Sequence, residues 1–76
     1  MKTTTIKVSS IEAVRDFVDI VRKYECDIDL SSGRYLVDAK SIMGIFSLDL
    51  MNPIKLTVHS DDCEGIFDEI KAYIVE

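Results

Sequence analysis

The sequence predicts an α+β fold, an open-faced two-layer β-sandwich in the order β-α-β-β-α-β-α, in which three helices cover one face of a four-stranded antiparallel sheet. Three observations lead to this prediction. Four short segments alternate apolar and polar residues, as strands with one buried face do. Two longer segments repeat apolar residues at three- and four-residue steps, and a shorter one does so over two turns. Elements with one apolar face bury it by packing in two layers.

The first strand is expected to end near Val8, and the first helix follows it directly. Ser9 and Glu12 have the spacing of a capping box, in which each side chain bonds the backbone amide of the other residue. We therefore expect this pair to begin the helix. Its apolar stripe consists of Ile11, Val14, Phe17, Val18, Val21 and Tyr24.

The middle of the chain is expected to form a hairpin around Gly33, followed by a short helix from Ser41 to Leu48 with Ser41 as its N-cap. Asn52-Pro53 then turns the chain into the last strand, on which His59 would face away from the core.

A final helix is expected to open with Asp61 and Glu64, whose spacing is again that of a helix cap. Its buried stripe would be Ile66, Phe67, Ile70, Tyr73 and Ile74. The 76 residues suffice for a single domain, 1–76.

The composition argues against several classes of partner. The net charge is -5, so a nucleic-acid backbone would be repelled. The chain has no apolar run of membrane-spanning length and its start does not resemble a signal peptide, so we expect no membrane and a cytoplasmic protein. Cys26 and Cys63 lack a CxxC spacing and are expected to remain reduced, buried thiols. No ligand cluster surrounds His59 in the sequence, so no metal and no cofactor are expected.

The segment Lys40-Ser41-Ile42-Met43-Gly44-Ile45-Phe46-Ser47-Leu48 resembles the regulatory-serine segment of HPr proteins of low-GC Gram-positive bacteria. HPr is the histidine-containing phosphocarrier protein of the bacterial sugar phosphotransferase system. Lys23-Tyr24 followed by Asp27-Ile28-Asp29-Leu30 is similar to the end of the family's first helix and the start of its second strand. The resemblance extends over nearly the whole chain and implies the HPr-like fold and a role in sugar transport or carbon catabolite regulation.

One part of the family pattern is missing. HPr proteins carry a Gly-(Leu/Ile)-His-Ala-Arg-Pro stretch at the start of the first helix, where the histidine accepts a phosphoryl group from Enzyme I. Here that place reads Val8-Ser9-Ser10-Ile11-Glu12, so no catalytic residue is assigned and Ser9, Ser10 and Glu12 are the nearest positions. A serine would form a stable ester, and Glu12 would repel a phosphoryl dianion. Capping is the simpler role for both serines.

The resemblance also implies a second site. In the HPr proteins that this chain resembles, the serine matching Ser41 is phosphorylated by the ATP-dependent HPr kinase, and the product binds a transcriptional repressor. Ser41 is therefore the expected regulatory phosphorylation site. Ile42, Met43 and Phe46 are the expected partner-binding residues, although periodicity alone leaves open that they are core residues. Ile45 and Leu48 are expected to point inward.

These observations favour a regulatory or partner-binding module, not an enzyme, whose partners would be phosphotransferase-system proteins or their regulators: an Enzyme I-like protein, HPr kinase or a repressor. Two alternatives remain open. The first is a functional phosphocarrier of the PEP-dependent sugar phosphotransferase system that uses another residue. The second is an interaction protein without any phosphorylation, for example a homodimer formed through an exposed sheet edge.

Overall fold

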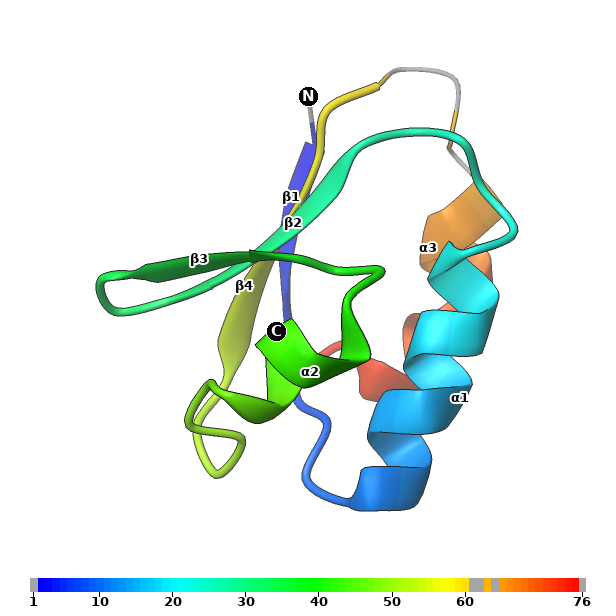
Figure 1. Ribbon diagram of the computed structural model, residues 1–76. Helices are drawn as coiled ribbons and strands as arrows, with labels where there is room; N and C mark the ends of the chain where they lie inside the picture. Colours follow the sequence, from blue (N-terminus) through cyan, green and yellow to red (C-terminus); the bar gives the residue numbers. More distant parts are fainter. Residues whose placement is uncertain (1, 61–62, 64, 76) are drawn as a thin grey trace.

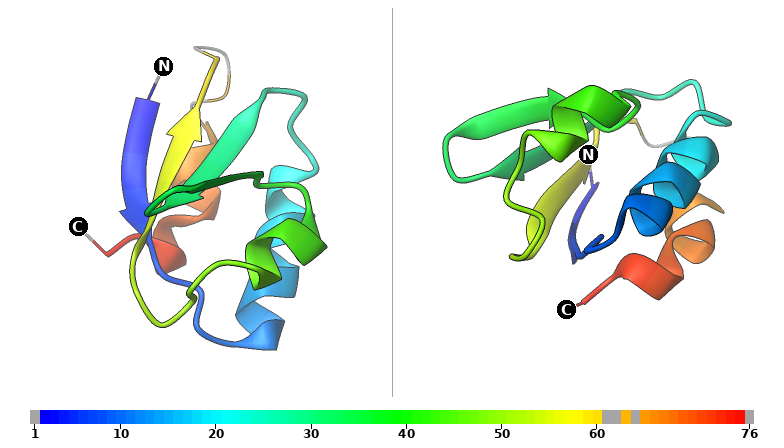
Figure 2. Two further views of the ribbon diagram at one scale, coloured as in Figure 1. Left: turned by 60° about the vertical axis from the view of Figure 1, so that its left-hand side comes forward. Right: turned by 60° about the horizontal axis from the view of Figure 1, so that its bottom comes forward.

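The computed structural model describes residues 2–60, 63 and 65–75 and confirms the predicted fold class (Figure 1). The strands pair in the order β1-β4-β2-β3, and every pairing is antiparallel. The helices lie on one face of this sheet, which leaves the other face open (Figure 2). The elements are β1 (Lys2–Ile6), α1 (Ile11–Val21), β2 (Ile28–Ser32), β3 (Tyr35–Asp38), α2 (Ile42–Phe46), β4 (Ile54–Val58), α3 (Gly65–Glu69) and the 3-10 turn η1 (Lys71–Tyr73).

The core lies between the sheet and the helices. Strand β4 is central and turns Ile54, Leu56 and Val58 inward, while Lys55 and His59 are exposed on its other face. From the helical layer, Phe17 is fully buried and packs edge to face on Tyr73, with ring centroids 5.9 Å apart. The apolar residues that alternate along the strands and those that recur every three to four positions along the helices thus pack against each other in one apolar layer.

Helix α1 begins one residue later than the capping box predicts. Its N-cap is Ser10, whose Oγ accepts a hydrogen bond from the amide of Ala13 at 3.0 Å. The predicted box of Ser9 with Glu12 is therefore wrong. The physical reason is that two adjacent serines offer the same hydroxyl, so the local pattern cannot decide which of them caps the helix.

The C-terminal part of the chain departs from the predicted continuous helix. Helix α3 ends at Glu69, and the residues after it form the 3-10 turn η1. Tyr73 and Ile74 are partly buried, whereas Ile66 and Ile70 are fully buried as expected. The predicted helix start at Asp61 and Glu64 lies outside the described residues.

The segment after η1 pairs with the outer edge of β1, which explains why the helix stops. Ile74 forms an antiparallel bridge with Ile6. The amide of Lys7 donates to the carbonyl of Tyr73 at 2.8 Å, and the amide of Val75 donates to the carbonyl of Thr5 at 3.0 Å. Edge amides and carbonyls need partners, and a helix continued through Ile74 would not supply them.

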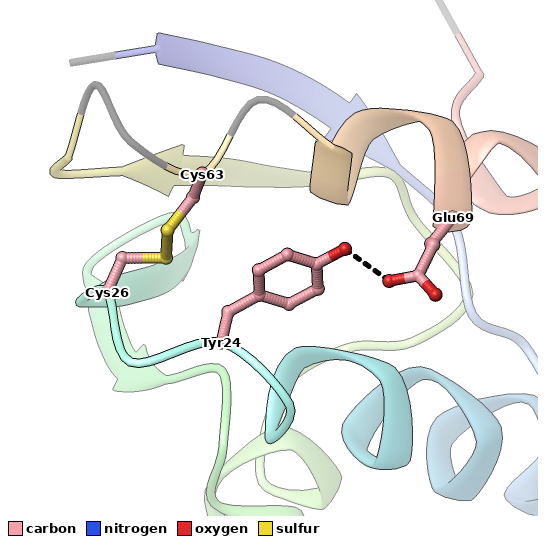
Figure 3. The surroundings of a disulfide bond; sticks show 4 residues. All are labelled: Tyr24, Cys26, Cys63 and Glu69. Carbon is pink, nitrogen blue, oxygen red and sulfur yellow. Dashed lines mark hydrogen bonds between the residues drawn. A yellow bond between two sulfur atoms is a disulfide. The ribbon is translucent and has the colours of Figure 1, made fainter.

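Cys26 and Cys63 form a disulfide, so the expectation of reduced thiols is wrong (Figure 3). Both residues are buried, at 8% exposure. The bond joins the loop after α1 to the segment between β4 and α3, with 37 residues of separation and a Cα–Cα distance of 6.7 Å. The fold brings these two segments together at one end of the sheet, and the spacing of the cysteines in the sequence does not reveal that proximity.

A hydrogen bond lies beside the disulfide, between α3 and the end of α1 (Figure 3). The Tyr24 hydroxyl donates to the Glu69 carboxylate, and the Nζ of Lys23 lies 3.5 Å from the other carboxylate oxygen. The hydrogen bond is the main reason that the pKa of Glu69 is lowered; desolvation opposes this effect and the charge of Lys23 adds to it. The same hydrogen bond is the main reason that the pKa of Tyr24 is raised.

Tyr24→Phe should therefore raise the pKa of Glu69 toward its ordinary value, as measured by NMR titration of the side-chain carboxyl. Because the pKa of Glu69 is lower in the folded protein, the interaction stabilises the fold above the unfolded-state pKa. That stabilisation is lost as the pH falls through the folded-state pKa. Tyr35→Phe, at an exposed tyrosine, is the matched control and should leave the titration of Glu69 unchanged. Identical Glu69 titrations in wild type and Tyr24→Phe would contradict the assignment.

Among the described residues, no helix combines the length and apolar character that crossing a bilayer requires.

Candidate functional site

Ser41 caps α2, as the sequence predicts. Its backbone is extended, with φ -98° and ψ 105°, and its Oγ accepts a hydrogen bond from the amide of Gly44 at 3.2 Å. At the other end of α2, the Oγ of Ser47 donates to the carbonyl of Gly44 at 2.6 Å. Ser41 is partly exposed and lies at the start of the helix.

Gly44 lets α2 lie close to β3. A Cβ atom at this position would lie 3.2 Å from the Cβ of Val37 and 3.2 Å from the Oγ of Ser41. Contacts of that length are tighter than ordinary van der Waals packing, so a larger residue would push against both the strand and the cap. The glycine inside this apolar run therefore allows α2 to pack close to β3, and this packing positions Ser41.

Arg22 holds the residue that precedes Ser41. At the C-terminal end of α1, its Nε and one Nη donate to the carbonyl oxygen of Lys40 at 3.3 Å and 3.1 Å. The guanidinium therefore lies next to the peptide bond that joins Lys40 to Ser41. Arg22 was not among the site residues predicted from the sequence. No local signal marks this contact, because the two residues are 18 positions apart.

The apolar residues of α2 divide between the core and the surface. Ile45 is fully buried and Leu48 is 6% exposed, which confirms their inward orientation. Met43 is 76% exposed and Phe46 38% exposed, so these two side chains form what we call the α2 surface. Ile42 is partly buried against the core and contributes less to that surface than expected. Met51, in the loop after α2, is also exposed and was not among the predicted residues.

The N-terminus of α1 carries hydroxyls but no imidazole. Ser9, Ser10 and Glu12 are all exposed, and the hydroxyl of Ser10 is engaged in the helix cap. The Ser10 hydroxyl thus accepts the hydrogen bond of a backbone amide in the first turn of α1, and this role is structural.

His59 is the single histidine of the sequence and lies far from that helix start. Strand β1 is antiparallel to β4, with Ile6 opposite Ile54 and Lys2 opposite Val58. Helix α1 follows the Ile6 end of this pair, whereas His59 follows Val58 at the other end. At about 3.3 Å per residue, the two ends are roughly 15 Å apart along the strand.

Acidic residues surround His59 on the open face of the sheet. Its Nε2 lies 2.6 Å from an Oδ of Asp29, and its backbone amide donates to the carbonyl of Asp27 at 2.9 Å. The same residues, with Asp38 and Lys40, line a shallow hollow of about 210 Å³. The imidazole is already paired with Asp29, and Asp27 and Asp38 add negative charge to the same hollow, so this is a poor place for a phosphoryl dianion. Within the described ranges, no group of three or more potential ligands could hold a metal ion.

The comparisons with known proteins agree with this architecture. The family model PTS-HPr, described as the PTS HPr component phosphorylation site, matches residues 10–76. No curated protein matches the chain significantly. The crystal structure of HPr-C-His from Thermoanaerobacter tengcongensis is similar, with a TM-score of 0.81, 30% sequence identity and coverage of 95% of this chain and 89% of that one.

A phosphocarrier protein HPr from Bacillus anthracis str. Ames is also similar, with a TM-score of 0.70 and 27% identity over 97% of this chain and 96% of that one. The family model covers far more than half of the sequence, and the sheet order and helix placement match these solved structures. The chain therefore belongs to the PTS-HPr family.

Proposed function

We propose that this chain is a regulatory or partner-binding member of the HPr family that acts through Ser41 and the α2 surface without histidine phosphotransfer. Membership of the family makes it a phosphocarrier-like protein related to the phosphotransferase system. We place it in the cytoplasm, with the phosphotransferase proteins that it would contact. The observation that carries the proposal is the position of His59, its only imidazole.

Phosphoryl relay needs a good acceptor at a place that a donor protein can reach and that stabilises the charge. At the start of α1, where the family resemblance puts the acceptor, the chain offers Ser9 and Ser10. Serine esters are too stable for rapid reversible transfer. His59 is at the opposite end of β4, on the open face, and is paired with Asp29. Both features support a chain that does not relay phosphate.

Ser41 has surroundings that suit a phosphate group. The residue is partly exposed, and the guanidinium of Arg22 is bound to the carbonyl of the residue before it. A phosphoserine carries close to two negative charges, and arginine pairs well with such an anion. The amide of Gly44, which now donates to the Ser41 hydroxyl, would face the same group. Modification would therefore leave the short helix in place and change the charge beside the α2 surface.

The α2 surface supports a role in docking. Met43 and Phe46 expose flexible and aromatic apolar area side by side in one short helix. Methionine adapts its shape to different partners, and aromatic side chains contribute strongly to interface energy. An Enzyme I-like protein, HPr kinase and a repressor are the proposed partner classes.

The first test asks whether the chain accepts phosphate as a carrier. With Enzyme I and phosphoenolpyruvate, its intact mass should stay unchanged, while HPr from Bacillus anthracis serves as the positive control. A mass increase in wild type that disappears in His59→Ala would overturn the proposal and favour the alternative, a functional phosphocarrier.

The second arm of this test uses HPr kinase and ATP. We expect one phosphoryl group to be added to wild type and none to Ser41→Ala. Ser47→Ala is the matched control, since Ser47 is the other α2 hydroxyl and should leave the modification intact. Failure of the kinase to modify wild type, with the Bacillus protein modified in parallel, would reject Ser41 as the regulatory site.

A further inference from the structure

The two outer edges of the sheet differ in whether another segment of the chain pairs with them. Part of the β1 edge is covered by the segment around Ile74. At the other side of the sheet, β3 pairs with β2, and among the described residues no segment pairs with its outer edge. Figure 2 shows the β2–β3 hairpin at the margin of the molecule. An open strand edge presents unpaired amides and carbonyls to any strand that can approach it.

The pairing pattern reveals which backbone groups are free. The amide of Ala39 donates to the carbonyl of Ile28 at 2.9 Å, so Ala39 points its backbone toward β2. Backbone direction alternates along an antiparallel strand, so Val37 and Tyr35 also bond β2, and the amide and carbonyl of Leu36 point outward. The carbonyl of Asp38 points outward too, and it accepts a hydrogen bond from the amide of Ser41.

The side chains at this edge are unusually apolar for an unpaired strand. Tyr35 is 67% exposed and Leu36 is 68% exposed, and the two lie on opposite faces of the sheet. Edge strands are normally protected by charged side chains, above all lysine, by proline or by a covering segment. Here the flanking charges are of opposite sign, Arg34 before the strand and Asp38 at its end.

We propose that β3 is a self-association edge, at which it pairs antiparallel with β3 of a second copy of this chain about a two-fold axis at Leu36. In that register, Leu36 lies opposite Leu36 and the two residues exchange both backbone hydrogen bonds. Tyr35 of each copy lies opposite Val37 of the other on the helix-covered face. The side chain of Arg34, in the hairpin turn just before the strand, would pair with that of Asp38 of the other copy on the open face.

Charge complementarity selects a second copy as the partner. Within its own sheet, Asp38 lies directly opposite Asp29, and like charges at such positions are unfavourable. Neither Arg34 nor Asp38 makes an ion pair within the described part of the chain. One oxygen of Asp38 accepts from the amide of Lys40 at 2.9 Å, which leaves the other for Arg34 of the second copy. Sliding the strands by two residues would lose both ion pairs, so the register is specific.

The association should be weak. Strand β3 has only four residues, so the interface is small, and we expect a dissociation constant on the order of 10⁻⁵ to 10⁻⁴ M. Both copies also carry a net charge of -5, which opposes association at low ionic strength. The dimer would not involve the Ser41 hydroxyl, so this inference does not depend on the proposed function.

Sedimentation equilibrium over a range of concentrations tests the pairing. Wild type should show a monomer–dimer equilibrium, and Ser41→Ala should show the same one. Arg34→Asp alone and Asp38→Arg alone should each raise the dissociation constant about tenfold, because each variant places like charges opposite each other twice. When the two variants are mixed, every facing pair is again of opposite sign, so a heterodimer should form with near wild-type affinity.

Leu36→Pro provides a variant that does not depend on charge. The amide of Leu36 points away from β2, so proline should leave the hairpin folded, as circular dichroism can check. In the dimer it removes both of the hydrogen bonds that the two Leu36 residues exchange. We expect this variant to be monomeric. Wild type that remains a monomer up to about 1 mM overturns the proposal. A dimer that is insensitive to Leu36→Pro, or variants that do not associate when mixed, would overturn the β3 register equally.

Discussion

Phe17→Ala should lower the free energy of unfolding by about 3–5 kcal/mol. Phe17 has no exposed surface, and its ring packs edge to face on Tyr73 across 5.9 Å. Removing the ring leaves a cavity between α1 and the C-terminal turn that the surrounding backbone cannot fill. Urea unfolding followed by circular dichroism measures the change, since the chain has no tryptophan.

Ile11→Ala is the matched control on the same helix. Ile11 is 67% exposed, so its truncation removes little buried area and should change stability by no more than about 0.5 kcal/mol. Equal effects of the two substitutions would contradict the placement of α1 with Phe17 toward the sheet.

Opening the Cys26–Cys63 disulfide should lower the free energy of unfolding by about 2–4 kcal/mol. The bond links two residues that are 37 positions apart in the sequence. Without it, the chain gains conformational freedom mainly in its unfolded state, which favours unfolding. Unfolding of wild type should therefore shift to lower urea concentration when a reductant is added.

The double variant Cys26→Ala with Cys63→Ala is the control for this experiment. It should be less stable than oxidised wild type and insensitive to the reductant. If reductant leaves wild-type unfolding unchanged, the two cysteines are not bonded in solution. Disulfides are rare in a reducing cytosol. If the protein is kept reduced there, its free energy of unfolding is the one measured in the presence of reductant.

The regular elements could be predicted because their signals are local. The alternation in β4 and the stripe Val14, Phe17, Val18 and Val21 in α1 each follow from residue order within one element. Their assembly into two layers then follows from the need to bury one face of each element. These features account for the correct fold class.

The features that could not be predicted depend on contacts between distant segments. The disulfide needs two loops to meet at one end of the sheet, and the end of α3 is decided by the free edge of β1. The shift of the α1 cap from Ser9 to Ser10 is a smaller error of the same origin, because two equal local choices were settled by the rest of the fold.

The candidate site was predictable in part for the same reason. The cap at Ser41 and the burial of Ile45 follow from the residues of α2 alone. The contact of Arg22 with Lys40 and the partial burial of Ile42 require α1 and the core to be in place. That Ser41 is modified, and that Met43 and Phe46 bind a partner, remain predictions.

The C-terminal segment that pairs with β1 also limits how large an assembly of this protein can grow. Polymerisation by strand addition requires two unpaired strand edges on every subunit, because each subunit must pair with a neighbour on both sides. Ile74 and Val75 cover part of the β1 edge, so among the described residues β3 is the edge strand that no other segment covers. The proposed pairing of β3 about a two-fold axis therefore ends at a closed pair, because neither copy has a second β3 edge to offer to another molecule.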